Sequence, residues 1–204
     1  LDQLRGWSHC TPSRLSLMTG RLPPHVGETQ DSVLPPNMTT LPEKLQQAGY
    51  ATHGAGRFVV FGLGPEPTTV GFDTFLESSG GPTQIAPYWW EREDARATQR
   101  LCDIVDSHPV DQPVFLYLAT ENAHFSEDAE VRPKYTGDLP DWFPGDWALY
   151  VGQLRVVDDA LLNITRSLKN RGMWNDTLLI FITDHGQDEK ASPNANLLLS
   201  GGKY

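Results

Sequence analysis

The sequence predicts an α/β fold in which helices flank a largely parallel central sheet. Two short apolar runs, at 113–118 and 177–182, are typical of strands that are buried on both faces. Between them, apolar residues recur every three or four positions from Trp147 to Leu168, which is the spacing of a long amphipathic helix that ends near Gly172. Helical and extended segments alternate along the chain, and this order predicts parallel strands.

The other elements are indicated by local signals. Pro42 near the start and Gly49 at the end mark a short helix, because proline suits a first helical turn and glycine suits the position after the last one. The segment 62–87 is rich in Gly, Pro and Thr and predicts mostly loop. The expected elements are a helix at 41–49, a strand at 50–54, an interruption of the loop at 71–75 and a surface helix at 90–105.

Composition and charge limit the possible functions. Hydrophobic residues make up 39% of the 204 residues, so we expect one folded domain over 1–204. The net charge of −10 comes from scattered acidic residues, which argues against a nucleic acid partner but allows an anionic substrate at a locally positive site. No run is long enough to span a membrane. The sequence starts at Leu1 and stops at Tyr204 without a terminating element, so we expect a fragment truncated at both ends.

The stretch that begins at Cys10 predicts a helix with an anion-binding start. Pro12 suits the first helical position, and Thr11 can cap the free amides. Cys10 would then lie at the positive end of the helix dipole, and Arg14 would add a fixed cation one turn along. A sulfate ester or a developing oxyanion suits such a place; the alternative is a buried structural cysteine with a surface arginine. The residues expected to pack this helix onto the core are Leu15, Met18 and Leu22.

Polar side chains follow both predicted buried strands, where ligands bind in parallel sheets. Asp184 could ligate calcium or magnesium, whereas the imidazole of His185 suits softer metals such as zinc or manganese. His124 could bind sulfate or donate a proton to a leaving oxygen. Lys203, after two glycines, could present an ammonium group to an anion. The alternatives are a capping Asp, turn or loop histidines and a solvated lysine.

The run Cys10-Thr11-Pro12-Ser13-Arg14, followed by Thr19-Gly20-Arg21, resembles the modification signal of the formylglycine-dependent sulfatase family. The likeness continues along the whole chain and looks closest to the arylsulfatase B-like branch. It implies an alkaline-phosphatase-like fold and part of the family's N-terminal catalytic domain. The other segments that resemble the family are 45–53, 71–75, 115–119 and 172–177.

The resemblance implies a role for each candidate residue. Cys10 would be oxidised by the formylglycine-generating enzyme, and its hydrated aldehyde would attack the sulfur of a sulfated small molecule or glycan. Arg14 would hold that hydrate in place. One calcium ion would be bound by the modified Cys10, Asp184 and His185. The residues that would contact the sulfate group are His124, Arg57 and Lys203.

Two departures from the family pattern bear on activity. The family commonly has Gly-Lys-Trp-His where this chain has Gly56-Arg57-Phe58-Val59, so Val59 replaces a histidine that serves as base. Losing a general base typically costs about 10²–10⁴-fold in rate. The paired aspartates that complete the family's metal site usually precede the cysteine by more residues than the nine present here.

Three functions are therefore compared. The first is a sulfuric ester hydrolase acting on an aryl sulfate or a glycosaminoglycan-type sugar sulfate. The second is a catalytically weakened sulfatase-like glycoprotein that binds sulfated glycans without turnover, which Val59 favours. The third is a phosphatase or phosphodiesterase of the same superfamily, whose nucleophile is usually Ser or Thr, so that Cys10 argues against it.

Glycosylation sequons indicate the secretory pathway. Asn37, Asn163 and Asn175 each begin an Asn-x-Ser/Thr triplet without proline. We therefore expect a lysosomal or extracellular glycoprotein. The two cysteines give no disulfide framework, and Cys102 is expected to be a buried apolar thiol.

Overall fold

The computed structural model describes residues 9–29, 31–35, 37–58, 66–78, 88–124, 130–143 and 145–186, so that Val59 and Lys203 lie outside the described residues. Within these residues the sheet has three strands in the order β2-β1-β3, and both pairings are parallel. The prediction of an α/β fold with a parallel sheet is therefore confirmed. The strands are β1 (Ala51–Gly56), β2 (Thr74–Glu77) and β3 (Val114–Ala119).

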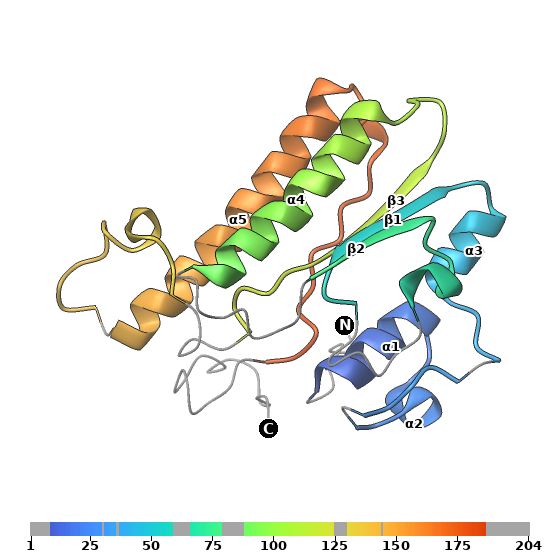
Figure 1. The fold of residues 1–204 in the computed structure, drawn as a ribbon, viewed down its shortest axis with the longest axis horizontal. Coiled ribbons are helices and arrows are strands. Elements are labelled where there is room, and N and C mark those ends of the chain that lie inside the picture. Colours follow the sequence, from blue (N-terminus) through green and yellow to red (C-terminus); the bar gives the residue numbers. More distant parts are fainter. Residues whose placement is uncertain are drawn as a thin grey trace.

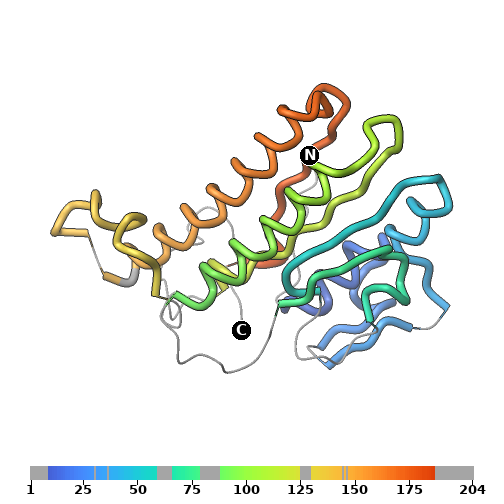
Figure 2. The backbone as a smooth tube through the Cα atoms, turned by 45° about the horizontal axis from the view of Figure 1, so that its top comes forward, coloured from blue at the N-terminus to red at the C-terminus, as the bar shows by residue number. Residues whose placement is uncertain are grey.

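Helices cover both faces of this sheet (Figure 1). α4 and α5 lie side by side on one face, and α1 and α3 lie on the other, an arrangement that is also visible from a second direction in Figure 2. The α-helices of the described part are α1 (Cys10–Thr19), α2 (Pro23–Val26), α3 (Leu41–Gln47), α4 (Trp89–Ser107) and α5 (Gly145–Asn170). The short 3₁₀ helices there are η2 (Pro67–Val70), η3 (Pro133–Tyr135) and η4 (Trp174–Asp176).

The two faces of the sheet carry separate apolar cores, because side chains alternate across a strand. On β3, Phe115 and Tyr117 join the core beneath α1, whereas Leu116 and Leu118 join the core beneath α4 and α5. Residues 114–118 of β3 are only half-buried, although the sequence predicted burial on both faces. Among the described residues β3 is an edge strand, because it pairs only with β1.

α1 begins two residues earlier than the sequence predicted. His9 is the N-cap residue and the helix starts at Cys10, so that Thr11 lies inside the first turn and is not the cap. Leu15 and Met18 are buried as expected, whereas Leu22 lies beyond α1 and is 70% exposed. The capping prediction failed because Cys10 itself adopts helical geometry, which places the helix start directly at the candidate nucleophile.

The strand predicted at 177–182 is wrong for the described structure. The segment is extended and runs back beside β3 in both views (Figures 1 and 2), yet it pairs with no described strand. Its apolar side chains are exposed, from 44% for Leu179 to 83% for Leu178. A strand needs backbone hydrogen bonds with a neighbour, and among the described residues this segment forms no such ladder with β3 or with any other strand. The segment still carries Asp184 to the carboxyl end of the sheet.

Gly56 shapes the turn at the end of β1. Its φ is +97°, and a Cβ atom there would lie 1.8 Å from the carbonyl oxygen of Ala119 on β3. Only glycine tolerates this approach without strain. The turn lets the amide of Arg57 donate to the same Ala119 oxygen at 3.0 Å, which fixes Arg57 at the carboxyl end of the sheet.

The exposure of the three sequon asparagines and the burial of Cys102 agree with what the sequence predicted. Asn37, Asn163 and Asn175 are all exposed, as glycosylation requires, and the modification itself stays a prediction. Cys102 is 7% exposed and lies in the core beneath α4 and α5, so the prediction of a buried thiol is confirmed. Among the helices of the described residues, none has the length and apolar character needed to cross a membrane.

Candidate active site

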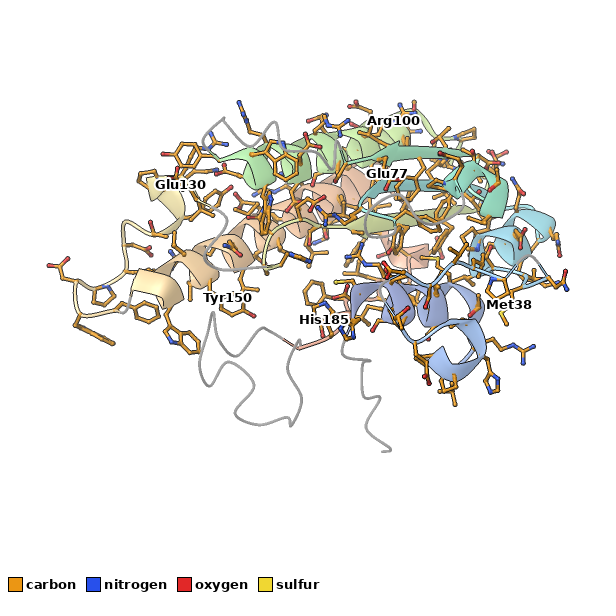
Figure 3. All side chains as sticks on the ribbon, turned by 60° about the horizontal axis from the view of Figure 1, so that its bottom comes forward. Met38, Glu77, Arg100, Glu130, Tyr150 and His185 are labelled. Carbon is orange, nitrogen blue, oxygen red and sulfur yellow. The ribbon has the colours of Figure 1, made fainter. Side chains whose placement is uncertain are left out.

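Five predicted site residues meet at the carboxyl end of the sheet. They are Cys10, Arg14, His124, Asp184 and His185, and they come from three separate parts of the chain. The Sγ atom of Cys10 lies 2.9 Å from Nε2 of His185 and 3.8 Å from Nε2 of His124. Figure 3 shows His185 beside α1. The rule that ligands bind beyond the carboxyl ends of parallel strands thus located the cluster correctly.

The start of α1 is suited to an anion. The N-cap side chain makes no capping hydrogen bond, and the first turn contains no acidic residue. Amides in a first helical turn have no partner within the helix, and together with the dipole they favour negative charge. Cys10 is fully buried at this position.

Arg14 joins two parts of the site. Its Nε donates to Oδ2 of Asp184 at 3.1 Å, and one terminal nitrogen donates to the backbone oxygen of Arg57 at 2.6 Å. Arg14 is only 8% exposed, so its charge acts in a poorly screened environment. Arg14 therefore holds both the carboxylate and the turn that follows β1.

His185 is oriented by its backbone neighbour. Its Nδ1 lies 2.7 Å from the oxygen of Gly186 and donates to it. In the imidazolium form Nε2 also carries a proton and donates to the Cys10 thiolate, whereas in the neutral ring Nε2 keeps a lone pair. Burial lowers the pKa of His185, but the hydrogen bond with Cys10 and the charge of Asp184 outweigh burial and raise it. Imidazoles that bind metals commonly donate their second N–H to a carbonyl in this way.

The two cations of the cluster stabilise its two anions. Burial and the charge of Asp184 would raise the pKa of Cys10, but the hydrogen bond from His185 and the charges of His185 and Arg14 outweigh them, and the pKa lies below its ordinary value. Burial likewise opposes ionisation of Asp184, yet Arg14 and His185 lower its pKa. Thiolate, imidazolium and carboxylate are therefore stabilised together.

Cys10, Asp184 and His185 can hold a divalent cation in part. Their ligand atoms lie within 4.8 Å of one another. Arg14 takes Oδ2 of Asp184, so the carboxylate offers Oδ1, which faces His185 at 3.6 Å. Sulfur, oxygen and nitrogen together suit zinc, whereas calcium takes about 6–8 oxygen ligands. Replacing the thiol by the oxygens of formylglycine makes the set harder, and these residues would then supply part of a calcium shell.

Arg57 points its guanidinium at a residue that the sequence did not single out. Its Nε and a terminal nitrogen bond the two carboxylate oxygens of Glu121 at 3.1 and 2.7 Å. Glu121 is 1% exposed. A bidentate ion pair of this kind fixes the arginine side chain. The role of Arg57 in sulfate binding stays a prediction.

The thiol pKa values give a direct test of this geometry. In metal-free protein with unmodified Cys10, the ultraviolet absorbance of thiolate should rise in two steps as pH increases. Cys10 titrates below the ordinary thiol pKa and Cys102 above it, because burial raises the pKa of Cys102. His185→Ala removes the hydrogen bond that stabilises the thiolate and should move the first step to higher pH. Cys102→Ala, as the control, should remove only the second step; a first step unmoved by His185→Ala would contradict the contact.

Comparison with known proteins decides the family. The model of the sulfatase family matches residues 4–204. The chain belongs to the sulfatase family. Arylsulfatase J of Mus musculus is 29% identical over 227 residues, which cover 95% of this chain and 38% of that protein. Arylsulfatase A of Homo sapiens is 27% identical over 228 residues, which cover 89% and 43%. This sulfatase-family chain thus spans about two fifths of the length of these relatives.

Solved structures share the fold. The crystal structure of Ps i-CgsB matches with a TM-score of 0.74 and 20% identity, over 97% of this sulfatase-family chain and 52% of that one. The phosphonate monoester hydrolase of Agrobacterium radiobacter matches with a TM-score of 0.63 and 20% identity, over 90% and 54%. At this identity the likeness establishes the alkaline-phosphatase-like α/β fold and leaves the reaction to the site residues.

Proposed function

We propose that this sulfatase-family chain provides the nucleophile end of a sulfuric ester hydrolase of the arylsulfatase B-like branch, acting on an aryl sulfate or a glycosaminoglycan-type sugar sulfate. The observation that carries the proposal is Cys10 in the first turn of α1, in contact with His124 and His185 and within the electrostatic reach of Arg14. The Sγ atom marks the carbon-bound position at which the hydrate oxygens of formylglycine would lie.

The reaction would proceed through a covalent sulfate ester. One hydroxyl group of the formylglycine hydrate gives its proton to solvent water, its oxygen attacks sulfur, and the bond between sulfur and the alcohol oxygen breaks. His124 donates a proton to that departing oxygen, and the alcohol leaves. The second hydroxyl then gives its proton to His124, which restores the proton donor, and its oxygen forms the aldehyde C=O while the bond from carbon to the sulfate oxygen breaks. Sulfate leaves, and water hydrates the aldehyde again.

The other groups of the site would hold charge during this cycle. A divalent cation, when bound, would neutralise negative charge on the sulfate. Asp184 and His185 would hold it, as their mutual distance and their contacts with Arg14 and Gly186 support. Arg14 would keep Asp184 ionised and orient the hydrate. We propose calcium as the cation, with lysosomal or extracellular location of the glycoprotein.

A second candidate function is binding of sulfated glycans with little or no turnover. One observation favours it. Val59, outside the described residues, stands where the family has a base. The two candidates share the site and differ in whether a substrate is hydrolysed there.

A mass spectrum combined with a turnover assay tests the proposal. The tryptic peptide Gly6–Arg14, from protein made in a secretory host, should weigh roughly 18 Da less than the thiol form, since –CH₂SH becomes –CHO. The same protein should hydrolyse 4-nitrophenyl sulfate. A converted peptide without turnover would favour the glycan-binding candidate. An unconverted Cys10, beside a second sulfatase that is converted in the same cells, would refute the mechanism.

A further inference from the structure

The loop that carries His124 is held by side chains from two helices. After β3 ends at Ala119, the chain turns through Glu121, Asn122 and Ala123 to His124. Ala123 has a φ of +68°, a left-handed conformation that costs a non-glycine residue free energy. Such a conformation persists only where surrounding contacts determine it, and three successive amides of this loop provide those contacts.

Asp94 on α4 accepts most of these hydrogen bonds. Its Oδ1 receives the amide of Glu121 at 2.7 Å, and its Oδ2 receives the amide of Asn122 at 3.0 Å and the side-chain Nδ2 of Asn122 at 2.7 Å. Asp94 is 1% exposed, so these contacts are closed to water. A buried carboxylate is tolerated only when hydrogen bonds or charges compensate it, and here the loop amides do so.

Gln153 on α5 holds the next amide. Its Oε1 accepts from the amide of Ala123 at 2.9 Å, and Gln153 is fully buried. Asp94 and Gln153 lie on neighbouring helices that pack against each other, so the loop is bonded to a rigid pair of elements. Contacts from both α4 and α5 thereby hold the loop in the conformation that gives Ala123 its positive φ.

The hydrogen bonds that Asp94 and Gln153 accept from the amides of 121–123 form a clamp on this loop, and His124 is the next residue along it. The imidazole ring of His124 lies edge-on to Trp90 of α4, with centroids 5.8 Å apart, and its Nε2 is 3.8 Å from Cys10 Sγ. We propose that Asp94, assisted by Gln153, is a positioning residue that sets His124 against the nucleophile. The inference rests on the proposed role of His124 as proton donor.

The charge state of Asp94 suits this role at neutral pH. Burial raises the pKa of Asp94 to about 6, although the hydrogen bonds from Glu121 and Asn122 oppose the rise. Above that value the carboxylate is charged, and both oxygens accept. The nearby carboxylate of Glu121 is balanced by Arg57, which ties the turn after β1 to the same loop.

Asp94→Asn tests the proposal, because it keeps the shape of the side chain but replaces one acceptor oxygen by an NH₂ group. That group cannot accept hydrogen bonds from the loop N–H groups that it faces. Displacing a catalytic group by about 1 Å can cost ~10²-fold in rate. We expect a fall of that size in kcat for an alkyl sulfate, whose departing oxygen needs a proton, and a much smaller fall for 4-nitrophenyl sulfate. KM should change little for both. Asp103→Asn, an exposed carboxylate on the same helix, is the matched control and should change neither.

A second measurement applies whether or not the protein turns over. Amide exchange at Glu121, Asn122 and Ala123 should accelerate in Asp94→Asn, and the imidazole resonances of His124 should shift, with neither change in Asp103→Asn. If Asp94→Asn does not fold, Gln153→Met is the substitute variant, because it removes only the acceptor of the Ala123 amide. Amide exchange at Ala123 should then accelerate in Gln153→Met.

The outcomes separate the two proposals. Equal loss of kcat for both sulfates, or unchanged exchange and an unchanged His124 resonance, overturns the positioning role while leaving hydrolysis intact. An inactive wild-type protein refutes the proposed function. The amide exchange and His124 resonances then still test whether Asp94 positions the loop that carries His124.

Discussion

Replacing Cys10 by alanine is expected to remove sulfate-ester hydrolysis, with kcat lower by about 10⁶-fold, the size of the loss when a nucleophile is deleted. Alanine has no group that can be oxidised to an aldehyde, so no covalent sulfate ester can form. His124, His185 and Arg14 would remain, and they can bind an anion but cannot replace the attacking oxygen. Binding of a sulfated ligand should therefore persist while turnover is lost. Steady-state kinetics on 4-nitrophenyl sulfate and calorimetric titration with sulfate measure the two effects.

Cys102→Ala is the matched control for this experiment. Cys102 is the second cysteine of the chain, is also buried and lies on α4 in the core beneath the helices. Its replacement removes one buried sulfur and should lower stability slightly without changing kcat. Retained hydrolysis in Cys10→Ala would show that another group attacks the sulfur, and the assignment of the nucleophile would be wrong.

The sequence predicted the meeting of Cys10, His124, Asp184 and His185 for two different reasons. His124 follows β3, and Asp184 and His185 follow the extended segment 177–182, which reaches the same edge of the sheet although it is not the paired strand that was predicted. Cys10 was predicted to lie at the positive end of a helix, which favours an anion, and its role as nucleophile was implied by the resemblance to the sulfatase family. Each signal is local, so it could be recognised without knowing the distances that the fold creates.

Other parts of the site depend on distant contacts, which the sequence does not show. Asp94 lies in register with the buried Ala97 and Leu101, and Gln153 with Val156 and Ala160, so helical spacing could have indicated their burial. Their partners in the loop after β3 are apparent only from the packed structure. Glu121 stood in a polar stretch after β3, but its pairing with Arg57 follows from the parallel register that sets Gly56 opposite Ala119. The run 177–182 had a strong local signal that misled the prediction. Its apolar composition favours a buried strand, but strand formation also requires a hydrogen-bonded neighbour, which composition does not show.

Arg14→Met is expected to lower both stability and turnover. Methionine fills the apolar length of the arginine but leaves Asp184 and the carbonyl of Arg57 without their donor. Breaking a buried ion pair costs about 3–5 kcal/mol. The Asp184 side chain is 30% exposed, so water compensates part of the loss, and we expect roughly 2 kcal/mol in the free energy of unfolding. Denaturant titration measures it.

The effect of Arg14→Met on turnover follows from the same contacts. The pKa of Asp184 is held down chiefly by Arg14 against the opposing effect of burial, so removing the guanidinium raises that pKa and weakens cation binding. The loss of one charged donor at a developing oxyanion typically costs about 10²–10³-fold in kcat. Arg14→Lys keeps the charge but cannot reach both partners as a fork does, so its kcat should lie between those of the wild type and Arg14→Met.

Arg96 supplies the matched control for Arg14, because it also bonds one carboxylate and one backbone oxygen. Its partners are Glu93 and the carbonyl of Glu77, but its side chain is 42% exposed. Exposed pairs contribute about 0–1 kcal/mol, so Arg96→Met should change unfolding and kcat little. If Arg14→Met and Arg96→Met lowered the free energy of unfolding and kcat equally little, the buried contacts of Arg14 would contribute no more than an exposed ion pair, and the site would not depend on them. A large effect confined to Arg14 would instead show that the buried guanidinium joins the nucleophile helix, the Asp184 segment and the turn after β1 into one functional unit.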